Sequence, residues 1–332
     1  MIDKAREIIP GGVQHNLAFN YPFPLVFTKA EGAYLYDADG NKYFDFLQAG
    51  GPTVLGSNMP EVREEVIDLL NDCGPSTGLF HEYEYKLGKK ISDSMESVEM
   101  FRMLGSGTEA CMAAIRVARL ATGKKNVIKV GGAQGYFGIS PDLTVFGKVV
   151  AGGHPGAGGL GGKKEYMKFL SAGIAGGPKQ KKALIGGTMA ATPLSCVAGY
   201  HALSEIERTG AAEHAAAMGD RLTKGLQELI KKHDLPFVAW NQGSICHLET
   251  VGTLHYSINW KKPWQIPEVL KQTSLRQAEM EHMGAAYMAE GLVTLAGSRL
   301  YTSAAYTPEM IDEALEAFDR VFEKVGVVEV ED

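Results

Sequence analysis

The sequence contains few cysteines and no spacing typical of a metal site. Four cysteines occur among 332 residues, and no two of them form a CxxC pair. His81-Glu82 begins an HExxH pattern, but no histidine follows at the required position. These observations argue against a disulfide framework and a zinc site, and favour free thiols in a reducing compartment. The cysteines are Cys73, Cys111, Cys196 and Cys246.

The sequence also has no excess of positive charge and no long hydrophobic run. A net charge of −6 argues against a nucleic-acid partner. No stretch reaches the roughly 18 apolar residues that a membrane-spanning helix requires. The first residues are charged and are not followed by the apolar core of a signal peptide. We therefore expect a cytoplasmic protein with neither nucleic acid nor a membrane as partner.

Glycine, by contrast, is abundant, with 40 residues in the chain, many of them between positions 131 and 187. Glycine at this density indicates tight turns, or backbone that approaches another group closely. The length is sufficient for two domains.

Short apolar runs alternate with helical patterns along the middle of the chain. Two aromatic-rich runs flank the Asp-Gly turn at 37–41, which predicts a β-hairpin. The alternation that follows predicts an α/β domain with a parallel central sheet flanked by helices. The predicted strands cover 33–36, 42–47, 101–104, 126–130, 143–147 and 157–160, with a further apolar run at 148–151.

The predicted helices follow from apolar residues at helical spacing and from residues that begin or end helices. In the helix predicted over 108–120, the apolar stripe is Cys111, Ala114, Ile115 and Ala118, and Gly123 ends it. The other predicted helices begin at Pro60, cover 193–208, 212–232 and 266–290, and follow Thr307 near the end of the chain. The segment 237–256 and the helices after it predict a smaller α+β domain.

One candidate anion site lies where a predicted strand passes into a helix, in the segment Leu104-Gly105-Ser106-Gly107-Thr108-Glu109-Ala110. Small residues let the backbone approach an anion, and the N–H groups and dipole at a helix start attract negative charge. Ser106 and Thr108 add hydroxyl donors. The alternative is that Ser106 or Thr108 only caps the helix, because both residue types are common N-caps.

A second candidate is Lys148, which follows Gly147 at the end of the predicted strand 143–147. Ligands of α/β sheets bind at the carboxyl ends of strands, and burial there would lower the pKa of a lysine and make it reactive toward a carbonyl. Thr188, after Gly186-Gly187, could donate a hydroxyl to a phosphate. The alternatives are a surface lysine and a turn before a helix opened by Pro193.

The segment 156–161 matches the GxGxxG fingerprint of dinucleotide-binding proteins. However, no Asp or Glu occurs from Leu170 to Ile185, where the residue that binds the ribose is expected. The match therefore carries little weight for nicotinamide binding.

Taken together and in this order, these segments resemble the class III aminotransferases, which use pyridoxal 5′-phosphate (PLP). The resemblance is greatest to the branch of glutamate-1-semialdehyde aminomutases and β-amino-acid aminotransferases, and it covers nearly the whole chain. The motifs that carry it are Pro10-Gly11-Gly12, the hairpin at 31–40, Leu55-Gly56, residues 106–110, Asp142-Leu143-Thr144, Gly147-Lys148, Gly187-Thr188 and the helix after Thr307.

The resemblance implies a PLP-transferase fold of type I, with a Schiff base between Lys148 and PLP. Ser106, Gly107 and Thr108 would hold the phosphate, and Thr188 would reach the cofactor of a neighbouring subunit in a homodimer with shared active sites. Residues 51–208 would form the large PLP-binding domain, and residues 1–50 and 209–332 the smaller domain. The reaction implied is amino-group transfer between a small amino donor and a carbonyl acceptor.

The chain departs from the family pattern at Gly131–Ala133, where the resemblance implies that a large internal segment is deleted. The deletion would remove both the aromatic residue that stacks on the cofactor and the aspartate that pairs with the pyridine nitrogen, and no acid lies between Gly131 and Ser140. The shortened sheet could close if the strand 143–147 paired with 126–130. Without that aspartate the stabilisation of a carbanion by PLP would be weakened.

A second departure concerns the substrate, because residues 13–19 contain no arginine where family members that bind a carboxylate often have one. Either His15 replaces it weakly, or the substrate is neutral, as for the caprolactam racemases of this family. An isolated histidine near a terminus is more often only a solvent-exposed side chain, and we expect this for His15. We expect a transaminase or aminomutase, with a racemase as a further alternative. The rival expectation is a catalytically impaired PLP-binding protein or a structural remnant of the family.

Overall fold

The computed structural model describes residues 2–14, 24–126, 140–171, 181–250 and 280–325. Several predictions concern residues outside these ranges. They are the strand at 126–130 beyond Asn126 and its pairing with 143–147, the join at Gly131–Ala133, the contribution of His15, and the helix before residue 280. They stay predictions.

The chain forms two compact units, one from Met1–Met59 with Thr209–Asp332 and the other from Pro60–Arg208. We call them the terminal unit and the middle unit. The sequence places the first boundary at 50/51, nine residues before the boundary of the structure, and the second at 208/209.

The middle unit is built on a three-stranded sheet of β4 (Met100–Leu104), β5 (Leu143–Gly147) and β6 (Gly158–Gly162), in the order β4-β6-β5. Both β4 and β5 pair with β6 in the antiparallel sense, so these two outer strands run in the same direction. The prediction that neighbouring strands are parallel is therefore wrong for the described strands. The link from β5 to β6 contains only the 3₁₀ turn η5 (Lys148–Ala151) and a loop, and a parallel neighbour would need a longer crossover.

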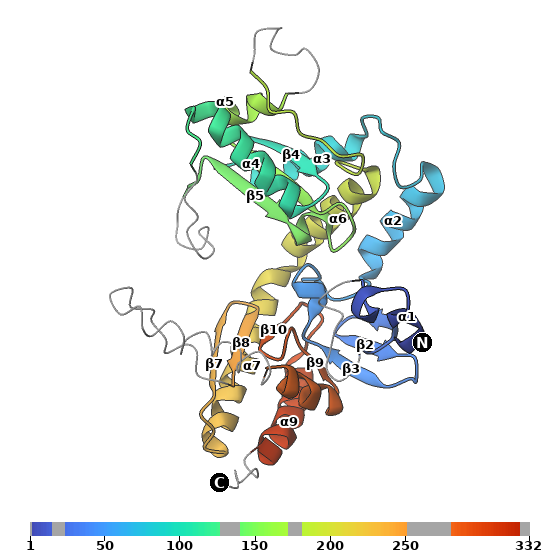
Figure 1. Ribbon diagram of the computed structural model, residues 1–332, viewed down its shortest axis with the longest axis vertical. Helices are drawn as coiled ribbons and strands as arrows, with labels where there is room; N and C mark the ends of the chain where they lie inside the picture. The colour runs from blue at the N-terminus through green and yellow to red at the C-terminus, as the bar shows by residue number, and fades with distance from the viewer. Residues whose placement is uncertain (1, 15–23, 127–139, 172–180, 251–279, 326–332) are drawn as a thin grey trace, which may run out of the picture. The chain divides into compact units, whose positions relative to one another are not determined.

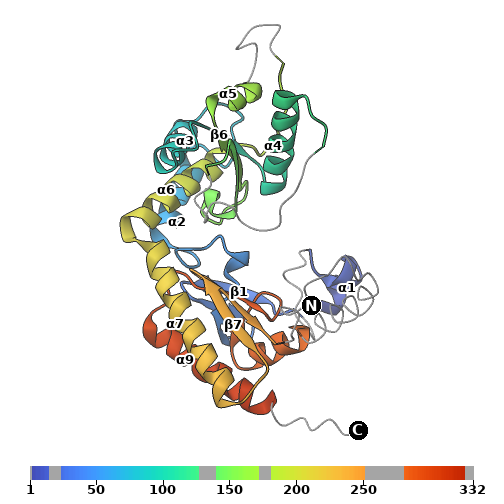
Figure 2. The same ribbon diagram turned by 90° about the vertical axis from the view of Figure 1, so that its left-hand side faces the viewer.

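Helices cover both faces of this sheet (Figures 1 and 2). In Figure 2, α4 (Gly107–Thr122) lies on one side of β6, and α3 (Glu82–Ser94) and α6 (Pro193–Thr209) lie on the other. Consecutive residues of β4 point to opposite faces, so Leu104 packs under α4 while Met103 packs with α3 and α6. The unit also contains α2 (Pro60–Asp72) and the short helices α5 (Lys164–Met167) and η6 (Lys168–Leu170).

The buried stripe of α4 differs from the prediction. Ala110, Ala113 and Val117 are buried, whereas Cys111 and Ile115 of the predicted stripe are exposed. The stripe is displaced by about one residue because the small side chains of Ala110 and Ala113 let the helix approach a sheet whose central strand is mostly glycine. The helix ends as predicted, with Gly123 in the left-handed conformation.

In the terminal unit, the predicted hairpin is confirmed as β2 (Tyr34–Asp37) paired with β3 (Lys42–Asp45). These strands form one sheet with β1 (Phe27–Glu31) and β9 (Leu292–Val293), and a second sheet contains β7 (Val238–Gln242), β8 (Ile245–Glu249) and β10 (Arg299–Tyr301). The short elements are α1 (Ile2–Arg6), η1 (Pro10–Gly12) and η3 (Gln48–Gly50).

The core of the terminal unit is aromatic. Phe46 and Tyr306 stack with ring centroids 5.0 Å apart, and Phe318 of α9 (Pro308–Val325) packs beside Phe46. Helix α9 packs on α7 (Ala211–Lys232). Thr307 caps α9 as predicted, since its Oγ1 accepts a hydrogen bond from the Met310 N–H at 3.3 Å.

Among the described residues, no helix is both long and apolar enough to span a membrane, and no three His, Cys, Asp or Glu side chains gather as metal ligands.

The packing of β6 leads to a prediction about stability. Leu160 is the only non-glycine residue of this strand and is fully buried against α4. Leu160→Ala should lower the free energy of unfolding of the middle unit by about 2–5 kcal/mol, because it removes a buried side chain and leaves a cavity. Val145→Ala on β5, at a side chain that is 40% exposed, should cost less than about 1 kcal/mol. Urea unfolding of both variants measures the difference, and equal losses would contradict this account of the packing.

Candidate active site

The candidate site lies at one edge of the middle sheet, where β4 and β5 end. Because these strands run in the same direction, their carboxyl ends meet at this edge, and β6 begins there. Gly158 of β6 stands opposite Leu104 on one side and Gly147 on the other. The segments that follow, Ser106–Thr108 and Lys148, are therefore brought to the same edge, as the sequence predicts for ligand-binding residues of an α/β sheet.

Ser106 is the N-cap of α4. Its backbone is extended and its Oγ accepts a hydrogen bond from the Glu109 N–H at 3.2 Å, so the capping alternative holds for this side chain. Capping and anion binding are compatible, since the first turn of a helix still presents N–H groups that have no partner within the helix. Gly107 and Thr108 are the first two residues of that turn.

Glycines let the backbones of these segments approach one another. A Cβ placed on Gly147 would lie 3.7 Å from the Gly107 Cα, so the end of β5 touches the start of α4. A Cβ placed on Gly158 would clash with the backbone of Ser106. Only glycine at position 158 allows the start of α4 to lie where it does.

Lys148 directly follows this contact and is the first residue of η5. Its φ of 54° lies in the left-handed region, which is uncommon for a residue with a side chain and is often found at functional sites. The side chain is exposed, so the prediction that Lys148 is desolvated is wrong for the described residues. The amine lies at the end of an edge strand, where the described part of the chain does not cover it.

His154 lies between η5 and β6, and its backbone N–H donates to the Ala151 carbonyl at 2.8 Å. The ring is half-buried, and this burial lowers its pKa, so the imidazole is neutral at pH 7. The sequence gives no signal that distinguishes this histidine from the others.

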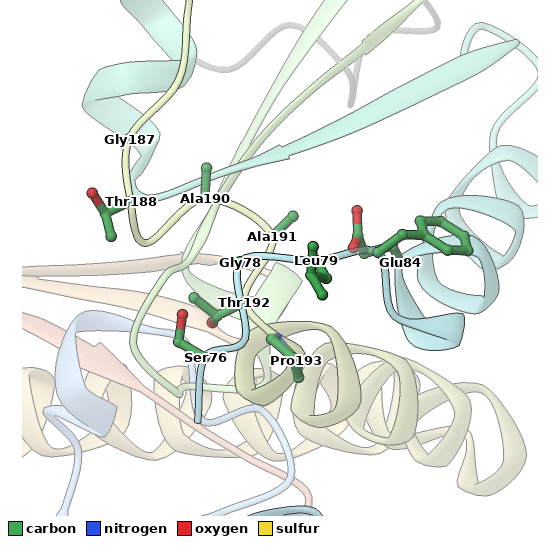
Figure 3. Close-up of a pocket in the computed structure, with 11 residues that line it drawn as sticks. Ser76, Gly78, Leu79, Glu84, Gly187, Thr188, Ala190, Ala191, Thr192 and Pro193 are labelled. Atoms are coloured by element: carbon green, nitrogen blue, oxygen red, sulfur yellow. The ribbon is translucent and has the colours of Figure 1, made fainter. Parts of the chain in front are cut away.

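Thr188 lies in an exposed turn and lines a cavity of about 410 Å³. Figure 3 shows that the residues around this cavity come from two segments, 76–84 and 187–193, with Thr188 and Glu84 toward opposite ends. Neither Lys148 nor residues 106–108 line it.

The 187–193 segment is nevertheless tied to the loop that follows Lys148. The Ser195 Oγ donates to the Pro155 carbonyl at 2.8 Å and lies 2.7 Å from the Thr192 Oγ1. The turn bearing Thr188 thus shares a packed framework with the lysine loop.

Asp142 is an acidic residue close to the lysine in sequence, two residues before Thr144 of β5. It is exposed and forms an ion pair with Lys163 at 2.5 Å. Asp142 precedes β5 and therefore lies at the opposite end of this strand from Gly147 and Lys148.

Glu109 is a site residue that the sequence reasoning missed. Its carboxylate Oε2 accepts a hydrogen bond from the Gly105 N–H at 2.8 Å. The signal was present, because Ser106-x-x-Glu109 has the form of a capping box, in which the fourth residue reaches back to the chain before the helix.

The residues fit the phosphate end of PLP. The glycines at 107, 147 and 158 form a cradle that a Cβ would fill, at the positive end of a helix dipole and next to a lysine. Asp142 supplies no carboxylate at the ring end, because it precedes β5 and lies at the opposite end of this strand from Gly147.

The cradle gives a direct test. Gly158→Ala should displace the start of α4 and weaken phosphate binding at least about tenfold, because the added methyl group overlaps the Ser106 backbone. Gly186→Ala, where a Cβ meets nothing within 4 Å, is the control and should have little effect. Fluorescence titration with PLP measures the affinity of both variants. Unchanged binding in Gly158→Ala would show that phosphate binding does not require the close approach of α4 to Gly158.

Comparison with known proteins agrees with this fold. The profile of the family "Aminotransferase class-III" matches residues 17–134 and 130–322. Similar solved structures include an omega-transaminase from Sphaerobacter thermophilus, with 20% identity, coverage of 97% of this chain and 96% of the other, and a TM-score of 0.81.

A β-phenylalanine aminotransferase from Variovorax paradoxus has 18% identity, coverage of 98% and 94%, and a TM-score of 0.80. A glutamate-1-semialdehyde aminomutase from Pseudomonas aeruginosa has 14% identity, coverage of 98% and 93%, and a TM-score of 0.79. These structures share the α/β fold of this chain, which confirms the predicted fold class. Since the family profile spans most of the sequence, the chain belongs to the class-III aminotransferases.

Proposed function

We propose that this protein transfers amino groups with Lys148 as the residue that bonds covalently to PLP. PLP is the cofactor of the family to which the chain belongs. The observation that carries the proposal is the meeting of Gly107, Gly147 and Gly158, which brings Lys148 and the start of α4 to one edge of the sheet. The substrates are a small amino donor and a carbonyl acceptor.

The residues have distinct roles in this proposal. The first turn of α4, with Gly107, Thr108 and the hydroxyl of Ser106, binds the phosphate through N–H and O–H groups. When bound, PLP supplies an electron sink for the bond that is broken next to the amino group. The substrate amine would displace the Lys148 amine from PLP, and the freed Lys148 amine would then move the substrate proton as base and then as acid. Transamination is the first reaction to test, followed by aminomutation and racemisation.

We propose further that two copies form a homodimer, with Thr188 reaching the phosphate of the neighbouring subunit's cofactor. Two large apolar side chains that line the same cavity as Thr188 are exposed, Leu79 at 78% and Phe80 at 77%. Met189, which follows Thr188 in the same turn, is 52% exposed. Exposed apolar surface of this kind is typical of surfaces covered in an assembly. The cavity would then be completed by the partner.

A second candidate is a PLP-binding protein with impaired catalysis. It is favoured by the family profile, which matches in two segments that meet at residues 130–134, where the sequence predicts an internal deletion. If the aspartate for the pyridine nitrogen is lost, Lys148 could bind PLP while proton abstraction stays slow. The closer relation to aminomutases and β-amino-acid aminotransferases, and a cytoplasmic location, stay predictions.

The role of Lys148 is tested by adding PLP to the protein and recording the visible absorption band of the lysine–PLP bond. We expect the band in the wild type and its loss in Lys148→Ala, because the covalent bond requires this amine. Lys89→Ala, at an exposed lysine of α3 paired with Asp93, is the control and should keep the band. A band that persists without Lys148 would overturn the assignment. Bleaching of the band by amino donors then separates the transaminase from the impaired binder.

The dimer is tested by sedimentation of the PLP-loaded protein. The wild type should sediment as a dimer, and Phe80→Asp should shift it toward the monomer, because a charge would be buried at the interface. Ile67→Asp, at a side chain on α2 that is 46% exposed, is a matched control outside the proposed interface and should stay dimeric. A monomeric wild type contradicts the proposal.

A further inference from the structure

Glu109 lies in the first turn of α4, and its carboxylate faces two glycine segments rather than solvent alone. On one side, Oε2 accepts the hydrogen bond from the Gly105 N–H at 2.8 Å. The same oxygen would lie 2.9 Å from a Cβ on Gly105. Gly105, which precedes the proposed phosphate-binding turn, therefore lies directly against the Glu109 carboxylate.

The other oxygen faces the segment that carries Thr188. The Glu109 Oε1 would lie 3.3 Å from a Cβ on Gly187, and Glu109 atoms are the nearest neighbours that such a Cβ would meet. One carboxylate thus lies between Gly105, which precedes Ser106, and Gly187, which precedes Thr188.

Two arginines attach the chain before Gly187 to the same strand and helix. Arg102 of β4 donates to the Ile185 carbonyl at 3.1 Å and also to the Leu170 carbonyl. Arg116 of α4 donates to the Leu184 carbonyl at 2.8 Å. The chain before Gly187 is therefore attached to β4 and α4, and Glu109 meets this chain at Gly187, the residue before Thr188.

We infer that Glu109 is a positioning residue that fixes the phosphate-binding turn of one site relative to the Thr188 turn that serves the neighbouring subunit's site. The inference rests on the proposed function. The dipole of α4 favours a negative charge in the first turn of the helix, where Glu109 lies. The Glu109 carboxylate therefore keeps the segments at Gly105 and Gly187 at a fixed spacing. Without it, the Gly105 N–H loses its acceptor and the Gly187 segment loses the group on which it packs.

The test compares PLP with pyridoxal, which lacks the phosphate, as ligands of the wild type and of Glu109 variants. Glu109→Ala should weaken the binding of PLP about tenfold and leave that of pyridoxal unchanged, since only phosphate contacts are displaced. Glu109→Gln keeps an oxygen for the Gly105 N–H and should stay within about twofold of the wild type. Thr307→Ala, which removes a cap from α9 in the terminal unit, controls for loss of stability and should not change the ratio of the two affinities.

A double-mutant cycle with Gly187→Ala adds an independent measurement. The added methyl group presses on the Glu109 carboxylate, so Gly187→Ala should weaken PLP binding in the wild type but much less in the Glu109→Ala background. Additive effects, or equal losses of PLP and pyridoxal in Glu109→Ala, would reduce Glu109 to a helix cap and overturn the inference. A wild type that binds no PLP overturns the proposed function and the inference with it, whereas tight PLP binding in Glu109→Ala overturns only the inference.

Discussion

The candidate site depends on the close approach of backbones at the edge of the middle sheet. Gly158 lies between the ends of β4 and β5, against the Ser106 backbone, and Gly107 touches Gly147 across the start of α4. A side chain at Gly158 would push the helix away from the strand that precedes Lys148. Because the strand is otherwise glycine, its stability comes from hydrogen bonds along both edges and from Leu160 alone. The same glycines that limit the packing of this strand let the start of α4 approach the sheet.

In the proposed site, the groups around this edge have different roles. The helix start offers N–H groups and a favourable dipole, and the Ser106 cap and the Glu109 carboxylate hold its first turn in shape. Lys148 is an exposed residue with a left-handed backbone, and it follows β5, which is an outer strand among the strands that the structure describes. A lysine in water is a weak base catalyst at neutral pH, so its reactivity in the proposed function depends on burial by the bound cofactor and by a second subunit.

Several parts of this arrangement could be predicted from sequence, and others could not. The hairpin, the N-cap Thr307 and the C-cap Gly123 follow from local turn and cap chemistry, and the structure confirms them. The predicted buried stripe of α4 was displaced by about one residue from the observed one, which contains Ala110, Ala113 and Val117. Small apolar residues occur on neighbouring faces of this helix, so the sequence alone does not show which face packs on the sheet. Glu109 was missed although its capping-box spacing was visible, since its contact with Gly187 joins segments 78 positions apart.

The sequence by itself determined the order of the motifs, and hence the family, because each motif is a local matter of small residues, hydroxyls and a lysine at fixed spacing. The tertiary structure decided which motifs meet. The direction of a strand depends on the length of the link that precedes it and on the strands with which it pairs. Only the fold therefore placed β6 between β4 and β5 and brought the carboxyl ends of β4 and β5 to one edge. It also left Lys148 exposed, because burial is set by what packs on a residue from elsewhere in the chain and not by its neighbours in sequence.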